Sequence, residues 1–109
     1  MDFSHFVIPA CPQCGSHLLK PDVVFYGESV PRERVERSRQ AVQGSRALLV
    51  LGSSLMVYSG YRFVLAEQEA GVPLAAVNHG VTRGDAAFSL KLASDVGPTL
   101  QHAAAILQI

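Results

Sequence analysis

Two cysteines, Cys11 and Cys14, are the residues of this chain whose type and spacing most clearly suggest chemistry. The turn Cys-Pro-Gln-Cys-Gly brings two thiolates together, and thiolates are common ligands of a structural Zn²⁺ ion. A redox dithiol has the same spacing, but it lies between a strand and a helix, whereas this pair lies in a loop rich in proline and glycine. The pattern therefore favours a zinc knuckle. A redox pair or two incidental cysteines are the alternatives.

A tetrahedral zinc site needs four ligands, and the sequence contains no second cysteine pair. His5 and His17 could complete the shell, but their distances from the cysteines match no common zinc-finger spacing. We interpret both as surface histidines and expect this chain to hold half of a metal site. Self-association of two chains through a shared zinc ion is a linked expectation.

Small polar turns follow two apolar segments further along the chain. Residues 52–54 (Gly-Ser-Ser) follow the apolar run 47–51, and residues 78–80 (Asn-His-Gly) follow the apolar run 74–77. In open α/β sheets, ligands bind beyond the carboxyl ends of parallel strands, where glycine permits close backbone approach. The two turns therefore predict a nucleotide site. The alternative is that these are ordinary turn residues, since Gly-Ser-Ser is not the G-x-G-x-x-G phosphate loop.

The elements around these turns predict an α/β arrangement. The runs 47–51 and 74–77 have the continuous apolar pattern of strands covered on both faces, and the pattern over 59–70 predicts a helix between them. Strand, helix and strand with short links form a βαβ unit with a right-handed crossover. Further predicted elements are a β-prone run at 23–25, a helix over 31–43, a strand or irregular connection at 88–92, and a helix from Pro98 to the end.

Two parallel strands are too few for a doubly wound sheet. We therefore expect strand residues such as Leu48, Val50, Ala75 and Val77 to leave an apolar face uncovered. This interpretation makes the chain the C-terminal portion of a larger α/β domain.

Length and composition limit the remaining possibilities. The chain has 109 residues, of which 49% are hydrophobic, so it is expected to fold as a globular domain. Nine basic residues balance nine acidic ones, which argues against a nucleic-acid partner, including the alternative of a nucleic-acid-binding zinc ribbon. The run 47–51 is too short to cross a bilayer, and the first residues have no signal-peptide pattern, so no membrane contact is expected.

Four segments, in order and spacing, resemble the second half of a sirtuin. They are the Cys11/Cys14 pair, residues 20–28 (Lys-Pro-Asp-Val-Val-Phe-Tyr-Gly-Glu), residues 52–57 (Gly-Ser-Ser-Leu-Met-Val) and residues 77–80 (Val-Asn-His-Gly). Sirtuins are NAD-dependent protein-lysine deacylases with a Rossmann-like domain and a small zinc module. Residues 57–63 are similar to the class II branch, which includes a mitochondrial member.

The resemblance implies an α/β fold class: half of a small zinc-binding module in residues 1–20, and the C-terminal part of a Rossmann-like parallel sheet in residues 21–109. It also implies a role for each matching residue. Zinc would be bound by Cys11 and Cys14. The acyl-lysine channel, with the substrate peptide added as a strand, would be formed by Val24, Phe25, Tyr26, Gly27 and Glu28. NAD would be contacted by Gly52, Ser53, Ser54, Asn78, His79, Gly80 and Val96. Tyr26 departs from the usual Phe of the family, and Val96 from its frequent Cys.

The resemblance does not extend to the N-terminal motifs of the family. The Gly-Ala-Gly-x-Ser phosphate loop, the Gln-Asn-x-Asp pocket, the catalytic His-Gly and the first cysteine pair have no counterpart here. None of the four histidines, His5, His17, His79 and His102, lies in a matching context. We therefore expect no catalytic residue in this chain and no deacylase activity from it alone, acylated lysine proteins being substrates of the full enzyme.

Two further expectations concern an alternative function and the location in the cell. The alternative function is a non-catalytic module that binds zinc or a nucleotide. The resemblance implies a cytoplasmic location if the source is bacterial and a mitochondrial one if it is eukaryotic.

Overall fold

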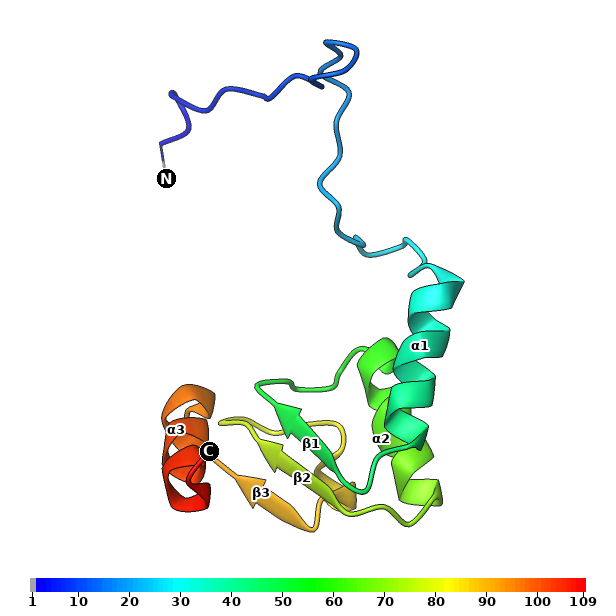
Figure 1. Cartoon of the computed structure of the whole chain (residues 1–109), viewed down its shortest axis with the longest axis vertical. Helices are drawn as coiled ribbons and strands as arrows, with labels where there is room; N and C mark the ends of the chain where they lie inside the picture. Colours follow the sequence, from blue (N-terminus) through cyan, green and yellow to red (C-terminus); the bar gives the residue numbers. More distant parts are fainter. Residues whose placement is uncertain (1) are drawn as a thin grey trace. The chain divides into compact units, whose positions relative to one another are not determined.

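The computed structural model describes residues 2–109, which divide into one unit that ends at Val30 and another that spans Pro31–Ile109 (Figure 1). The described residues of the first unit form turns and bends without a helix or strand. The second unit contains, in chain order, α1 (Arg32–Gln43), β1 (Leu48–Leu51), α2 (Tyr58–Glu69), β2 (Leu74–Val77), the short 3-10 helix η1 (Asp85–Ala87), β3 (Leu90–Leu92) and α3 (Val96–Leu107).

The three strands form one parallel sheet in the order β1-β2-β3. The predicted strands at 47–51 and 74–77 are confirmed, and the segment 88–92 supplies the third strand. Ser89 starts that strand, because its backbone N–H and its hydroxyl each donate to the carbonyl oxygen of Leu74 at 2.9 Å. Of the two alternatives for residues 88–92, the strand is therefore confirmed, and the parallel sheet has three strands and not the two that the apolar runs alone indicated.

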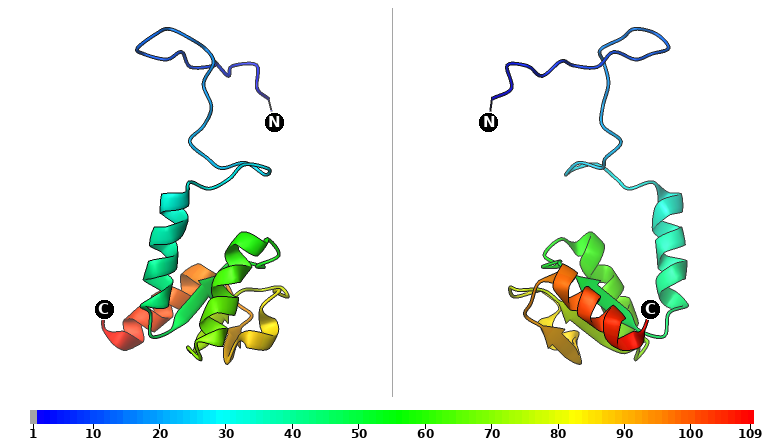
Figure 2. Two further views of the ribbon diagram at one scale, coloured as in Figure 1. Left: turned by 90° about the vertical axis from the view of Figure 1, so that its right-hand side faces the viewer. Right: turned by 60° about the vertical axis from the view of Figure 1, so that its left-hand side comes forward.

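Helices lie on both faces of the sheet. Figure 2 shows α1 and α2 on one face and α3 on the other. The core lies between the sheet and α2, where Leu55, Val64 and Leu74 are buried and Tyr61 and Phe88 pack against them. Burial of each such side chain contributes about 1.5–3 kcal/mol, so this layer is the main source of stability of the unit.

The uncovered apolar face differs from the sequence prediction. Leu48 and Val50 pack against the core, and Val77 is buried. Alternate residues of a strand point to opposite faces, so the other two leucines of β1 face away from α2. Leu49 is 49% exposed and Leu51 is 39% exposed. The face that carries α3 is therefore only partly covered (Figure 2), and the residues of β1 that it leaves exposed are Leu49 and Leu51, not the predicted Leu48 and Val50.

The start of one helix and the structure of one β-prone segment also differ from the sequence prediction. The last helix begins at Val96, two residues before Pro98, because proline in the first turn lacks only an N–H that the helix does not use. Residues 23–25 form no strand; the N–H of Val23 donates to the carbonyl oxygen of Pro21 at 2.8 Å, so this segment bonds within itself instead of along a neighbouring strand.

No helix within residues 2–109 is long and apolar enough to span a membrane.

Candidate site at the carboxyl edge of the sheet

The turns after β1 and β2 meet the start of α3 at the carboxyl edge of the sheet. The N–H of Gly52 donates to the carbonyl of Val77 at 2.9 Å, and the N–H of Asn78 donates to that of Leu92 at 3.0 Å. A Cβ atom added to Gly52 would lie 3.5 Å from Cγ2 of Val96. Three of the segments predicted to contact NAD are thus brought together by the parallel sheet.

The turn after β1 has a constrained backbone. Gly52 and Leu55 both have positive φ angles, 58° and 57°. The left-handed conformation is unfavourable for leucine, and two contacts offset its cost. The N–H of Leu55 donates to the hydroxyl oxygen of Ser53 at 3.2 Å, and the Leu55 side chain is buried in the core. Ser54 stays exposed, so the turn presents a polar group to solvent from a fixed backbone.

Arg83 holds the same turn from the segment that follows β2. Its backbone N–H donates to the carbonyl oxygen of Ser54 at 2.9 Å. Its guanidinium Nη1 donates to the carbonyl oxygen of Met56 at 3.3 Å. The guanidinium also lies over the ring of Tyr61, 4.6 Å from its centroid. Sequence reasoning missed Arg83, because an isolated arginine in a loop carries no signal of what it will contact.

His79 and Asp95 form an exposed pair across this edge. Nε2 of His79 lies 2.8 Å from Oδ1 of Asp95, and the two side chains are 67% and 74% exposed. Exposed pairs contribute about 0–1 kcal/mol, so this pair orients the two side chains more than it stabilises the fold. Asp95 was not predicted; its position directly before α3, beside Val96, is the signal that could have indicated it.

Behind the turn of residues 78–80, a polar cluster fixes the loop to β3. Nδ2 of Asn78 and Nζ of Lys91 each donate to the carbonyl of Gly80 at 2.9 Å. Lys91 also donates to both carboxylate oxygens of Asp85 at 2.8 Å, and the hydroxyl of Thr82 donates to Oδ1 at 2.6 Å. The hydrogen bonds from Lys91 and then Thr82 lower the pKa of Asp85.

The segment predicted to bind substrate lies in the unit that ends at Val30. The N–H of Glu28 donates to the carbonyl of Phe25 at 3.0 Å, and Oε2 of Glu28 accepts from the N–H of Phe25 at 3.0 Å. Gly27 permits this turn with a φ of 89°. Lys20 pairs with Glu28 at 3.2 Å and lies 5.1 Å from the ring centroid of Phe25. Val24, Phe25 and Tyr26 are exposed, so the turn presents apolar surface.

The two cysteines form a tight turn in the same unit. The N–H of Cys11 donates to the carbonyl oxygen of Ser16 at 2.8 Å, and the N–H of Gly15 donates to the carbonyl oxygen of Cys11 at 2.8 Å. Hydrogen bonds from the backbone of Cys14, the backbone of Gln13 and then the Cys14 thiol lower the pKa of Cys11. A lowered thiol pKa favours the thiolate, which is the form that binds a metal. No cluster of three or more metal-binding side chains occurs within residues 2–109.

Comparison with known proteins identifies one family. The sequence model of the Sir2 family matches residues 2–59. A NAD-dependent protein deacetylase of Bordetella pertussis is 59% identical over 91 residues, which cover 84% of this chain and 33% of that protein. A NAD-dependent protein deacetylase of Xanthomonas campestris pv. campestris is 62% identical over 90 residues, covering 83% of this chain and 30% of that protein. The chain thus spans about a third of the length of these relatives.

Solved structures agree with the sequence comparison. A structure from work on sirtuin substrate affinity superimposes with a TM-score of 0.81 at 31% identity, covering 94% of this chain and 43% of that one. A Sir2 structure with a p53 peptide and NAD⁺ gives a TM-score of 0.81 at 31% identity, covering 93% of this chain and 42% of that one. The α/β architecture with a parallel sheet is therefore the one found in these proteins.

Proposed function

The chain belongs to the Sir2 family, and we propose that it supplies the C-terminal NAD-binding and peptide-binding portion of an NAD-dependent protein deacylase. The observation that carries the proposal is the meeting of the turns after β1 and β2 with the start of α3 at one edge of the sheet. The relatives are named as deacetylases, which favours this function over a non-catalytic binding module. The class II-like branch is part of the proposal.

The NAD contacts would come from the carboxyl edge of the sheet. Gly52 permits close approach of the dinucleotide, and Ser53 and Ser54 offer hydroxyls next to it. Asn78 and His79 follow β2, where they would meet the adenosine ribose. The remaining proposed contacts are Gly80 and Val96. NAD, when bound, supplies the ADP-ribose group to which the acyl group is transferred, and the residues of this chain hold and orient it.

The peptide contacts would come from residues 24–28. Val24 and Phe25 would surround the acyl-lysine side chain, and the backbone up to Glu28 would pair with the substrate peptide as an added strand. Acylated lysine proteins are accordingly the proposed substrates of the complete enzyme. A related structure holds a p53 peptide and another holds an acetylated peptide, which supports this substrate class.

Zinc would be held by Cys11 and Cys14. The donor set fits, since a Cys-x-x-Cys turn with a lowered thiol pKa provides two thiolates, half of a tetrahedral shell. The ion would be structural and would take no part in acyl transfer. Its remaining ligands must come from outside the described pair.

A complementation assay tests the proposal. The chain alone is expected to leave an acetyl-lysine peptide unchanged in the presence of NAD, because no residue here is proposed as the general base. Mixing it with the N-terminal two thirds of the Bordetella pertussis relative is expected to give NAD-dependent deacetylation. Asn78→Ala should reduce that activity, whereas Gln101→Ala, an exposed change on α3, should not. Deacetylation by the chain alone would contradict the proposal.

A further inference from the structure

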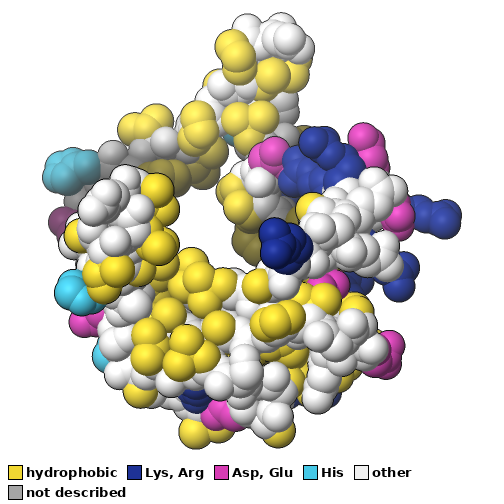
Figure 3. All heavy atoms as spheres, turned by 60° about the horizontal axis from the view of Figure 1, so that its bottom comes forward, with side chains coloured by type: hydrophobic (Ala, Val, Ile, Leu, Met, Phe, Trp, Pro, Cys, Tyr) yellow, Lys and Arg dark blue, Asp and Glu magenta, His cyan; other side chains and the backbone are white. Residues whose placement is uncertain are grey.

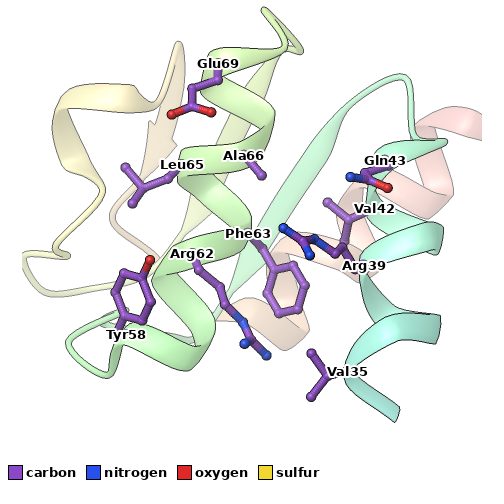
Figure 4. Close-up of a pocket in the computed structure, with 10 residues that line it drawn as sticks. All are labelled: Val35, Arg39, Val42, Gln43, Tyr58, Arg62, Phe63, Leu65, Ala66 and Glu69. Atoms are coloured by element: carbon purple, nitrogen blue, oxygen red, sulfur yellow. The ribbon is translucent and has the colours of Figure 1, made fainter. Parts of the chain in front are cut away.

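A groove between α1 and α2 lies outside the residues that the proposed function uses. It has a volume of about 400 Å³ and lies on the opposite face of the sheet from α3 (Figure 4). The residues that line it are Val35, Arg39, Val42, Gln43, Tyr58, Arg62, Phe63, Leu65, Ala66 and Glu69. Each of them is exposed or half-buried, so the groove is an open furrow along two helices and not an enclosed cavity.

Two arginines face each other across the floor of this groove. Figure 4 shows Arg39 of α1 and Arg62 of α2 on either side of Phe63, which lies between the helices. The guanidinium of Arg62 is 5.2 Å from the ring centroid of Phe63. Within residues 2–109, neither arginine forms an ion pair with a carboxylate. Arg39 is exposed and Arg62 is half-buried, so water solvates both guanidinium groups. Two cations of the same sign over an apolar floor favour an anionic occupant, which would reduce their mutual repulsion.

The positive charge beside the groove is a local excess on α1. The chain as a whole has nine basic and nine acidic residues, but α1 carries four arginines against two glutamates. The one acidic residue in the groove lining is Glu69, the last residue of α2, whereas Arg62 lies in the first half of that helix. The groove therefore has two cations beside its apolar floor and a carboxylate where α2 ends (Figure 4), and this uneven charge would orient an elongated occupant.

We propose that this groove binds an acidic peptide segment of a partner protein. Carboxylates of the peptide pair with Arg39 and Arg62, and one of its apolar side chains packs on Phe63 between Val35 and Val42. Charge complementarity selects the acidic sequence. The open form selects a peptide lying along the helices, since a small molecule would leave most of its surface exposed here. This inference is independent of NAD binding and of deacylation.

Fluorescence anisotropy on the purified chain tests the proposal. The probe is a labelled peptide in which leucine and phenylalanine are flanked by aspartates and glutamates, and its comparison peptide has asparagine and glutamine at the acidic positions. The acidic peptide is expected to bind, and the neutral one at least about tenfold more weakly, at about 0.1 M salt. Arg39→Glu and Arg62→Glu should each weaken binding of the acidic peptide by about tenfold or more, because attraction becomes repulsion.

Arg37→Glu is the matched control, since Arg37 lies on α1 outside the groove lining and the substitution changes the charge equally. It should change the affinity by less than about twofold. Equal binding of both peptides, or equal losses in the Arg37 and Arg39 variants, would overturn the proposal. So would a groove-dependent affinity for RNA or for anionic lipid vesicles that exceeds the affinity for the peptide. Circular dichroism checks that each variant is folded, and Arg39→Gln replaces any that is not.

Discussion

At the scale of single residues, Asp85 links the loop after β2 to the sheet. Its hydrogen bonds with Lys91 and Thr82 lower its pKa in the folded chain. A carboxyl group with a lowered folded pKa contributes stability above its unfolded pKa, about 3.9, and loses that contribution as the pH falls through the folded value. Asp85→Asn is therefore expected to lower the Tm at pH 7. The Tm difference from the wild type should shrink below about pH 4. Thermal unfolding at pH 7 and pH 3 measures it, and an equal difference at both values would contradict this role of the carboxylate.

The cysteine pair gives a second prediction at this scale. Two thiolates occupy half of a tetrahedral shell, so the isolated chain is expected to bind zinc weakly and at less than one ion per monomer. Cys11→Ser should remove most of that zinc and any dimer that forms through a shared ion. Metal analysis of the monomer and dimer fractions from gel filtration measures both effects. Tight binding of one ion by a wild-type monomer would show that another residue, such as His5 or His17, completes the site.

The residues of the candidate site differ in how far the sequence could indicate them. Gly52 and Asn78 directly follow apolar runs, so their place at the carboxyl edge followed from the βαβ pattern alone. Arg83 and Asp95 act through partners that are distant in the sequence, Met56 and His79. Such pairings depend on tertiary structure. The position of Asp95 before the last helix could have indicated that residue but not its partner, and no local pattern indicated Arg83.

At the scale of elements, the turn after β1 depends on glycine. Gly52 has a φ of 58°, and an added Cβ would make only an ordinary contact, 3.5 Å from Val96. The cost of Gly52→Ala is therefore backbone strain, about 1–2 kcal/mol of unfolding free energy. Gly97→Ala is the control: it lies in α3 with no atom within 4 Å of the new Cβ, and should stabilise the chain by about 0.5–1 kcal/mol. Urea unfolding of the two variants compares them. Equal stabilities would mean that the turn readily adopts another conformation.

Helices and strands with a long apolar pattern were predictable, whereas short ones were not. The helices α1 and α2 and the strands β1 and β2 lie within one residue of their predicted ends, because each has a continuous run or a 3.6-residue period. β3 has three residues, too few for a pattern, and depends on Ser89 bonding to β2. Residues 23–25 are β-prone but form a bend without a partner strand, since strand formation requires pairing that propensity does not supply.

At the scale of the whole molecule, the two faces of the sheet are covered to different extents: the core lies on the α2 face, and the α3 face leaves strand leucines partly exposed (Figure 2). The register places Leu49, Ala75 and Leu90 in one row and Leu51, Val77 and Leu92 in the next. The four leucines of these rows are between 39% and 55% exposed. Figure 3 shows a broad group of hydrophobic side chains on the molecular surface. A parallel sheet is ordinarily covered on both faces, so this face is expected to bind apolar partners unless further chain covers it.

The last prediction separates this open face from the core. Leu48 and Leu49 are adjacent on β1, but Leu48 packs against the core and Leu49 is 49% exposed. Leu49→Gln, with or without Leu90→Gln, is expected to reduce the binding of a fluorescent hydrophobic dye and the aggregation of the chain, and to change the unfolding free energy by less than about 0.5 kcal/mol. Leu48→Gln should instead lower the unfolding free energy by about 2 kcal/mol or more, because it removes core packing and places an amide there. Dye fluorescence, light scattering and urea unfolding of the three variants measure these effects. If the wild-type chain is a monomer that binds no dye, or if the Leu49 and Leu48 variants lose stability equally, the face is covered in solution and this description of the sheet is wrong.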